Sequence, residues 1–389
     1  MNATDPVSPN LRIFIVVTRG TVGGAQTSVF NLARELKKTG RAIVRVGFGD
    51  GEYLAQRCED AGIEYTRFAH LRRSLNPFSA IRSVAEFVRH FKRERYDVVH
   101  INSSNALFAA VAAKLSRHKP RVVFTFRGLS LLDEHYEMSR MKRRLYVWIF
   151  RVLLRFVDEP VFVSHENHAT ALRMGLVTKG TTIHNGLDPH ELVFDDREQA
   201  RRQLAEMTGV PVTDETFLIG SIGRLAYQKN YEFLIEQMVE MKKKYPALIA
   251  VIIGDGPEYN VLLERIKANG LESVVHLVGE ITDASRYMRG FDLFVLPSRY
   301  EGLSVTLIEA LFAGVPVLAS DVGGAVEQFE QAPFQVYPLN DGEEFRKRLT
   351  RLIDNPDIRD ELAEANVRRS EEFAIERVTQ AYHERYTQF

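Results

Sequence analysis

Pro297-Ser298-Arg299-Tyr300-Glu301-Gly302-Leu303-Ser304-Val305-Thr306-Leu307-Ile308-Glu309-Ala310 directly follows the strand-like run Asp292-Leu293-Phe294-Val295-Leu296. The run ends at Pro297, the loop holds Glu301 and Gly302, and an apolar helix is predicted to begin near Val305. A buried strand followed by a short loop and a helix is the unit from which parallel α/β sheets are built. The stretch therefore predicts an α/β fold.

Further strand-and-helix units extend from this stretch in both directions. The predicted strands are 11–17, 42–48, 97–101, 121–126, 160–163, 217–222, 248–253, 274–278, 292–296 and 315–319. Helical spacing is clearest at Thr27–Thr39, Asn76–Arg93, Tyr231–Lys244, Thr306–Ala313 and Phe373–Phe389. The pattern restarts near residue 216 after the polar stretch Asp188–Glu215, so the sequence predicts two similar domains with a boundary within 186–215.

Composition indicates a soluble enzyme of ordinary globular character. The 389 residues carry no net charge, but residues 1–190 hold 29 Lys and Arg against 17 Asp and Glu, a balance of +12. Such asymmetry suggests that the first half meets an anionic partner, or that the two halves attract each other.

One cysteine, Cys58, excludes an internal disulfide. No signal peptide is evident, and the run Val98–Ala113 is too short and polar to span a bilayer, so we expect a cytoplasmic protein.

Two glycine-containing loops follow predicted strands, where doubly wound sheets bind their ligands. Gly23 and Gly24 lie between strand 11–17 and the next helix, whose N-terminus can meet an anion. The spacing differs from the dinucleotide fingerprint, and a simple flexible turn is the alternative. Gly254-Asp255-Gly256-Pro257 follows strand 248–253 and is typical of a tight architectural turn.

Charged residues with possible chemistry follow strands 217–222 and 292–296. Arg224 and Lys229, next to Gly223, can converge on one dianionic group, although two solvated cations are the alternative. The backbone N–H groups of Leu303 and Ser304 are predicted at a helix start, which suits a diphosphate. Glu309 lies in an apolar stretch, where a carboxylate needs a partner such as ribose hydroxyls, unless it faces water.

These motifs together resemble glycosyltransferase family 4, the retaining enzymes of GT-B fold. The likeness rests on Glu301-x7-Glu309, Arg224 with Lys229, the Gly23-Gly24 loop and Asn185-Gly186-Leu187-Asp188. It implies two Rossmann-like domains facing across a cleft. Residues 1–187 would form the acceptor domain and 188–373 the donor domain, with 374–389 crossing back to pack on the first.

The resemblance also implies roles for individual residues. Arg224 and Lys229 would hold the donor diphosphate, Glu301 the transferred sugar and Glu309 the ribose. The further donor-binding positions are Gly23, Gly24, Gly223, Gly279, Ile281, Leu303 and Ser304. A UDP-sugar is favoured over a GDP-sugar, and no cofactor or metal is expected, since the chain has no Asp-x-Asp and no clustered His or Cys ligands.

One position departs from the family. Members often carry His-Gly after the strand that corresponds to 121–126, whereas this chain has Arg127-Gly128. An arginine cannot serve as a general base, but it can bind phosphate or an acceptor. His100, Asn102 and Arg127 are therefore the acceptor-side candidates, and this position lacks the histidine that the family links to the sugar or to catalysis.

Basic residues concentrate in 67–95 and 139–155. In the second segment Arg140, Arg143, Arg144, Arg151 and Arg155 share one arc of a helical wheel, with Trp148, Phe150 and Leu153 outside it. This suits an anionic membrane surface or a lipid-linked saccharide acceptor, unless the arc is only a solvated face. Leu71–Pro77 is similar to a segment of bacterial enzymes that build lipopolysaccharide and capsule, which favours the lipid-linked acceptor and a place on the inner face of the plasma membrane.

Two other functions are open from the sequence. A sugar-nucleotide 2-epimerase of similar fold would need acidic and histidine residues for proton transfer, and His100, His165, His168 and His184 are available. A catalytically silent sugar-nucleotide-binding subunit is conceivable because of Arg127. No nucleic-acid partner is expected, since the basic runs lack interleaved aromatic platforms.

Overall fold

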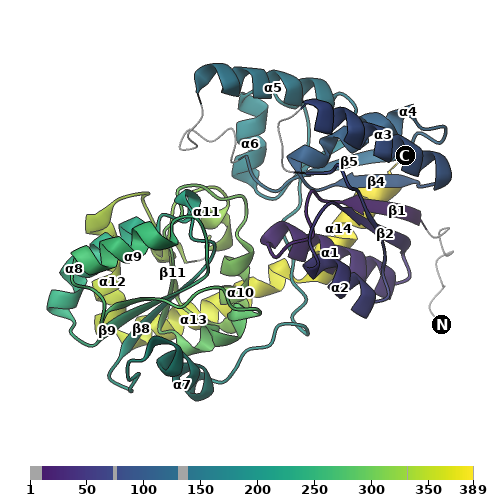
Figure 1. The fold of residues 1–389 in the computed structure, drawn as a ribbon. Helices are drawn as coiled ribbons and strands as arrows, with labels where there is room; N and C mark the ends of the chain where they lie inside the picture. The colour runs from purple at the N-terminus through teal and green to yellow at the C-terminus, as the bar shows by residue number, and fades with distance from the viewer. Residues whose placement is uncertain (1–10, 73–76, 130–138, 331, 389) are drawn as a thin grey trace, which may run out of the picture. The chain divides into compact units, whose positions relative to one another are not determined.

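The computed structural model describes residues 11–72, 77–129, 139–330 and 332–388. The chain divides into two compact units (Figure 1). The N-terminal unit comprises Met1–Gly186 and Ala374–Phe389, and the C-terminal unit comprises Leu187–Phe373. The expected division between 187 and 188 lies one residue further along the chain. Of the segment Leu71–Pro77, residues 73–76 lie outside the described residues.

A parallel sheet of order β3-β2-β1-β4-β5-β6-β7 forms the centre of the N-terminal unit. Its strands are β1 (Leu11–Val16), β2 (Ala42–Phe48), β3 (Glu64–Arg67), β4 (Val98–Ile101), β5 (Arg121–Phe126), β6 (Glu159–Phe162) and β7 (Thr181–Thr182). Its helices are α1 (Gly24–Lys38), α2 (Tyr53–Asp60), α3 (Pro77–Arg93), α4 (Phe108–Leu115), α5 (Arg140–Leu154), α6 (His165–Arg173) and α14 (Ile375–Thr387), with a 3₁₀ turn at Ser104–Leu107.

The C-terminal unit repeats this architecture with a parallel sheet of order β10-β9-β8-β11-β12-β13. Its strands are β8 (Phe217–Ile222), β9 (Leu248–Ile253), β10 (Val275–Leu277), β11 (Leu293–Leu296), β12 (Val317–Ser320) and β13 (Val336–Tyr337). Its helices are α7 (Arg197–Thr208), α8 (Tyr231–Lys244), α9 (Tyr259–Ala268), α10 (Val305–Ala313), α11 (Ala325–Gln328), α12 (Gly342–Asp354) and α13 (Pro356–Ser370). Short 3₁₀ segments lie at Tyr227–Lys229, Ala284–Gly290, Pro333–Gln335 and Glu371–Phe373.

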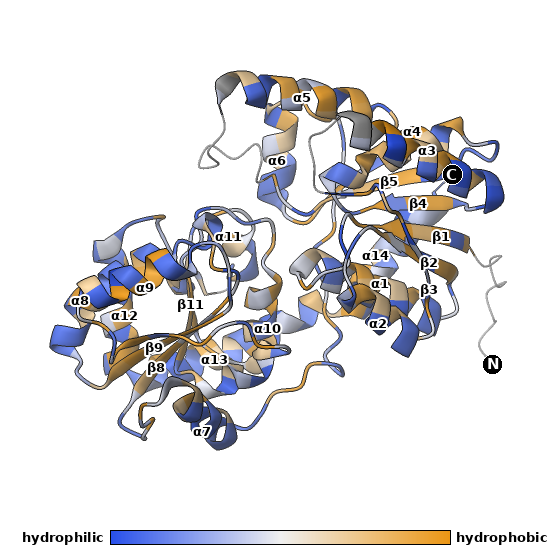
Figure 2. Cartoon of the chain, viewed as in Figure 1, coloured by the Kyte–Doolittle hydropathy of each residue, from blue (hydrophilic) through white to orange (hydrophobic). Residues whose placement is uncertain are grey.

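Both sheets are buried on two faces, as the continuous apolar runs predict. β9 is buried at every residue, and Figure 2 shows the strands of both sheets as predominantly hydrophobic. The predicted strands agree with the observed ones to within about two residues at each end, and the predicted two-domain α/β fold is confirmed. The edge strands β3, β7 and β13 were not predicted, because β3 and β7 are mainly polar and β13 has only two residues.

Helix α14 returns to the N-terminal unit at the end of the chain (Figure 1). Ile375, Val378 and Tyr382 belong to the same apolar core as β1, β2 and α1. The Tyr382 hydroxyl lies 3.0 Å from Thr125 Oγ1 of β5, and the Tyr386 hydroxyl lies 2.7 Å from His100 Nδ1 of β4. The apolar spacing expected over Phe373–Phe389 therefore has its partner in the first sheet.

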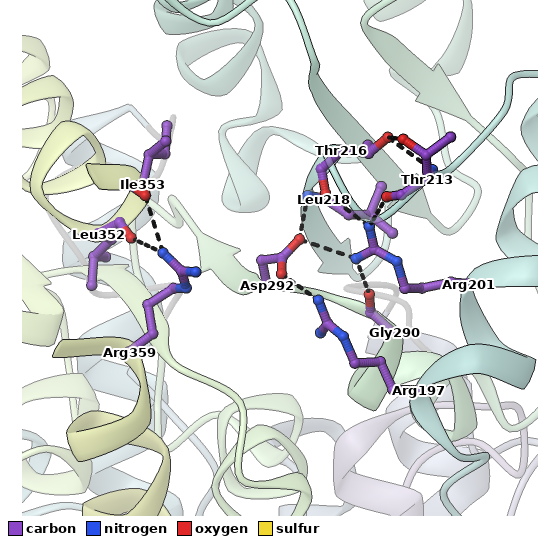
Figure 3. Close-up of polar contacts among 10 residues, drawn as sticks. All are labelled: Arg197, Arg201, Thr213, Thr216, Leu218, Gly290, Asp292, Leu352, Ile353 and Arg359. Carbon is purple, nitrogen blue, oxygen red and sulfur yellow. Dashed lines mark hydrogen bonds and ion pairs between the residues drawn. The ribbon is translucent and has the colours of Figure 1, made fainter. Parts of the chain in front are cut away.

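A buried ion pair fastens α7 to the second sheet (Figure 3). Asp292, at the start of β11, accepts hydrogen bonds from Leu218 N at 2.7 Å and Arg201 Nη1 at 3.1 Å. Arg201 also donates to the carbonyls of Thr213 and Thr216, so protein groups replace water around the buried charge. The same figure shows Arg359 of α13 donating to Leu352 O at the end of α12.

Candidate active site

The strand order places one switch point in each sheet, and ligands of such sheets bind there beyond the carboxyl ends of the strands. In the C-terminal unit it lies between β8 and β11, because β9 and β10 extend the sheet in one direction and β12 and β13 in the other. The loops that follow β8 and β11 carry Arg224, Lys229 and Glu301. The fold therefore brings the predicted donor-side residues to one edge of one sheet.

Lys229 and Glu301 form an ion pair at this edge. Lys229 Nζ lies 2.8 Å from Glu301 Oε1, and the two side chains are only 14% and 10% exposed. Ser298 Oγ donates to the same oxygen at 2.7 Å, and Gln228 Nε2 donates to Oε2 at 3.3 Å. Three donors thus fix the Glu301 carboxylate in one orientation.

The sequence did not reveal this pairing. It assigned Lys229 to a diphosphate and Glu301 to a sugar, whereas the structure joins the two side chains and adds Ser298 and Gln228 as positioning residues. Ser298 lies three residues before Glu301 and Gln228 precedes Lys229, so their closeness in sequence was the available signal.

Arg224 differs from Lys229 in its surroundings. Its side chain is exposed, and among the described residues nothing forms an ion pair or hydrogen bond with its guanidinium. The backbone beside it is held firmly, since Leu225 N donates to Asp255 O at 2.9 Å. Arg224 is therefore a cation with free donors on a fixed loop.

Glycines allow the loops after β8 and β9 to touch. Gly254 has a φ of 151°, and a Cβ there would lie 2.0 Å from Gly223 O. A Cβ on Gly256 would lie 2.2 Å from Leu225 O. These contacts leave no room for a side chain, so the architectural interpretation of this turn fits the structure.

Helix α10 begins beside Glu301. Ser304 is its N-cap, and the Ser304 hydroxyl accepts from Leu307 N at 3.4 Å. Leu303 and Ser304 are buried, so any contact they make with a ligand would come from their backbones. The first N–H groups of a helix have no partner within it, and the positive end of the helix dipole lies there.

Glu309, on the same helix, is half-buried and has no hydrogen-bond or ion-pair partner in the described part of the chain. Burial raises the pKa of Glu309 from an ordinary 4.5 to about 7, and the negative charge of Asp283 adds to the increase. A carboxyl group in this state is ready to accept hydrogen bonds from ligand hydroxyls.

Two further donor-side candidates, Gly279 and Ile281, lie at the same edge. Gly279 pairs with Gly254 through a hydrogen bond from Gly254 N to Gly279 O at 2.8 Å, and its φ of 82° is one that glycine adopts readily. A Cβ at Gly279 would meet nothing within 4 Å, so the loop leaves open space there. Ile281 follows in this loop and is half-buried.

In the N-terminal unit the switch point lies between β1 and β4. The loops after these strands are joined by a bond from Thr18 N to Ser103 Oγ at 2.9 Å. Helix α1 begins at Gly24, with Gly23 as its N-cap, and carries no acidic residue in its first turn. The Gly23–Gly24 turn therefore presents a helix N-terminus at the carboxyl edge of this sheet.

The three acceptor-side candidates have different environments. His100 is fully buried, and its two ring nitrogens bond to Thr125 and Tyr386, so it fastens α14 and has no nitrogen left for an acceptor. Asn102 is also fully buried, and its side-chain oxygen accepts from Arg127 Nη2 at 2.6 Å. Arg127 alone is partly exposed. The expectation that His100 contacts an acceptor is therefore corrected.

The basic helix expected over 139–155 is α5, and its aromatic residues separate onto two faces. Trp148 is 63% exposed, whereas Phe150 is buried in the core, and Leu153 packs against the same core. A shallow surface groove is lined by Arg143, Arg144, Val147, Trp148 and Arg151. No helix in the described ranges has the length and apolar character that a bilayer crossing requires.

Two family models match the chain. The model described as Glycosyltransferase Family 4 matches residues 22–191, and that described as Glycosyl transferases group 1 matches residues 205–369. An uncharacterized glycosyltransferase of Haemophilus influenzae is 24% identical over 95% of this chain and 98% of its own length. The UDP-Gal:alpha-D-GlcNAc-diphosphoundecaprenol alpha-1,3-galactosyltransferase of Escherichia coli is 25% identical over 73% of each chain.

The fold also matches solved structures. Anabaena Alr3699/HepE in complex with UDP and glucose superposes with a TM-score of 0.82 at 22% identity, over 98% of this chain and all of that one. At this identity the likeness concerns the fold, which is the GT-B arrangement of two Rossmann-like domains.

Proposed function

Because the chain belongs to glycosyltransferase family 4 and has the GT-B fold, we propose that it transfers a sugar from a nucleoside diphosphate sugar to a saccharide acceptor, with retention of anomeric configuration. UDP is the proposed nucleotide, since Alr3699/HepE was solved with UDP bound. The proposal includes no metal and no cofactor.

One observation supports the proposal above all others. The loops after β8 and β11 bring the free Arg224 guanidinium, the Lys229–Glu301 pair and the start of α10 to the same switch point. Two cations and a helix N-terminus suit a diphosphate, and an oriented carboxylate suits sugar hydroxyls. The Glu309 carboxyl farther along α10, for which the described ranges supply no partner, suits a ribose.

The chemistry required of these residues is electrostatic. When the bond between the anomeric carbon and the diphosphate oxygen breaks, the electron pair remains on the diphosphate, which gains negative charge. Arg224, Lys229 and the α10 dipole stabilise this charge as it develops. The acceptor hydroxyl forms the new bond to the anomeric carbon and gives its proton to the departing diphosphate oxygen.

We propose a lipid-linked saccharide as the acceptor, bound by the N-terminal unit. The galactosyltransferase of Escherichia coli named above acts, by its name, on a diphosphoundecaprenol-linked sugar. Residues 1–190 carry a balance of +12, which suits an anionic acceptor at an anionic bilayer. The protein is accordingly proposed to work at the inner face of the plasma membrane.

The first test identifies the donor by thermal stabilisation. A ligand that binds only the folded protein stabilises it and so raises its melting temperature. At a ligand concentration of a hundred times Kd, the free energy of unfolding rises by about 2.7 kcal/mol. We expect UDP and one or more UDP-sugars to stabilise the protein more than GDP-sugars do. A protein that melts at the same temperature with every nucleotide sugar would contradict the proposal.

The second test removes the two cations. Arg224→Ala and Lys229→Ala should each lower kcat/KM by about a hundredfold or more, the usual effect of losing one group that stabilises developing charge. Arg202→Ala and Lys243→Ala are matched controls, because their side chains are 62% and 64% exposed in the same unit. Near-normal turnover in both active-site variants would defeat the assignment.

Product analysis separates the rival functions. A 2-epimerase would convert the sugar nucleotide without an acceptor, whereas a transferase would make a new glycoside only with one. A silent subunit would bind the nucleotide and do neither. Donor hydrolysis without acceptor, if abolished in Glu301→Gln, would argue against silence.

A further inference from the structure

Arg127 is a cation held at the carboxyl end of β5 by two neutral side chains. Its Nε and Nη2 donate to the side-chain oxygen of Asn102, at 3.2 and 2.6 Å, and its Nη1 donates to that of Asn185. Both asparagines are buried. The two amides fix the plane of the guanidinium but bring it no negative charge.

Three titratable groups near Arg127, His100, Tyr382 and Tyr386, are also neutral. Burial and the charge of Arg127 hold the pKa of His100 well below its usual range, so the ring is uncharged at pH 7. Burial raises the pKa values of Tyr382 and Tyr386, which therefore keep their protons. Among the residues that the structure describes, no carboxylate forms an ion pair with Arg127.

Two other arginines with little exposure to solvent, one buried and one partly exposed, are paired. Arg201 of the C-terminal unit forms an ion pair with Asp292, and Arg121, at the other end of β5, forms one with Glu159. A charge removed from water is costly unless an opposite charge compensates it. Arg127, only partly exposed, lacks the compensation that Arg121 and Arg201 have.

Arg127 also has donors to spare. A guanidinium carries five N–H groups, and the bonds to Asn102 and Asn185 use three of them. One N–H therefore remains on each of Nη1 and Nη2. Two donors on one rigid plane suit the oxygens of a carboxylate or a phosphate.

We infer that Arg127 binds an oxyanion of the acceptor, so that the acceptor of this enzyme is itself anionic. The inference rests on the proposed function and extends it, because it names the charge of the acceptor and the residue that binds the charged group. The oxyanion is either a phosphate, as in a lipid-linked diphosphate, or the carboxylate of an acidic sugar. Without this ligand, Arg127 would serve only to hold Asn102 and Asn185 in place.

The test measures anion binding by calorimetry, with no nucleotide and no acceptor present. Its background is the Arg224→Gln/Lys229→Gln protein, in which the proposed donor site has lost its cations. The probes are inorganic pyrophosphate and glucuronate. We expect one of them to bind this background and to bind at least tenfold more weakly once Arg127→Gln is added. Binding of pyrophosphate alone indicates a phosphate, and binding of glucuronate alone an acidic sugar.

Arg117→Gln in the same background is the matched control. Arg117 is exposed between α4 and β5 and has no partner in the described part of the chain, so its loss changes the net charge equally. If Arg127→Gln does not fold, Arg127→Lys keeps the charge but loses the planar fork, and should bind the probe several-fold more weakly.

Two results would overturn the inference. One is a background protein that binds neither probe, and the other is equal binding by the Arg127→Gln and Arg117→Gln proteins. A failure of the proposed function would instead appear as a lack of nucleotide binding and sugar transfer, which this measurement does not use.

Discussion

At the scale of single residues, Glu309 shows how burial prepares a group for a ligand. The sequence indicated that a carboxylate in this apolar stretch needs a partner, and the structure gives it none among the described residues. Its pKa is about 7, so the folded protein is destabilised when Glu309 ionises. A site that lacks a donor for this group in the free protein is suited to receive one from a bound ligand.

This state predicts a pH dependence of stability. The pKa of Glu309 is about 7 in the folded protein and near 4.5 in the unfolded chain. The contribution of the protonated Glu309 side chain to the free energy of unfolding is therefore fully present below pH 4.5 and is lost as the pH rises through 7. This change corresponds to at most about 3 kcal/mol. Glu309→Gln should therefore gain stability relative to wild type between pH 5 and pH 8, as measured by urea unfolding.

Glu264→Gln is the control for this experiment, because Glu264 is an exposed carboxylate on α9. Its difference from wild type should stay nearly constant over the same pH range. A Glu309→Gln protein whose difference from wild type is equally constant would show that Glu309 is not destabilised by burial.

At the scale of elements, α14 is the piece whose position the sequence could not fix. Helical spacing of apolar residues over Phe373–Phe389 predicted the helix, but any apolar surface could have received it. The structure places it through two specific contacts, Tyr382 with Thr125 and Tyr386 with His100. Polar partners of this kind decide where an amphipathic helix lies, because each is costly to leave unpaired when buried.

We predict that Tyr386→Phe destabilises the protein by roughly 1–3 kcal/mol, since it leaves the buried His100 Nδ1 without its partner. The free energy of unfolding in urea measures the effect. Tyr65→Phe removes a hydroxyl that bonds to Glu59 at the surface, and its cost should stay within about 0.5 kcal/mol. Equal costs for the two variants would show that the His100 bond does not secure α14.

At the scale of the whole molecule, the uneven charge has a structural counterpart in α5. Met141, Leu145 and Trp148 are 80%, 56% and 63% exposed, and their spacing of four and three residues puts them on one face. Arg144 and Arg151 are exposed on the same helix. An exposed apolar stripe with arginines beside it is typical of a helix that lies in the interface of an anionic membrane.

We predict that the double variant Arg143→Glu/Arg144→Glu binds vesicles containing anionic phospholipid more than tenfold more weakly. Each basic residue near such a surface contributes about 1 kcal/mol, and reversal replaces attraction with repulsion. Co-sedimentation measures the binding. Lys242→Glu/Lys243→Glu changes the net charge equally on α8 and should have little effect. Unchanged sedimentation of the α5 variant would remove the membrane from the proposal.

The sequence by itself determined the α/β class, two similar domains, nearly every central strand and the loops that hold the candidate site. These features depend on local periodicity and on which residues follow a strand, and both can be read from neighbours in the chain. β3 and β7 consist mainly of polar residues and β13 of only two residues, so none of the three offers an apolar run long enough to predict a strand.

Only the tertiary structure decided which side chains meet. Lys229 and Glu301 are 72 residues apart, and Arg127 and Asn185 are 58 apart. The sequence suggested His100 as an acceptor-side residue, but one of its ring nitrogens bonds to Tyr386, which lies 286 residues away in the chain. The physical reason is that the energy of a polar group depends on its burial and its partners, and parallel strands assemble both from distant parts of the chain.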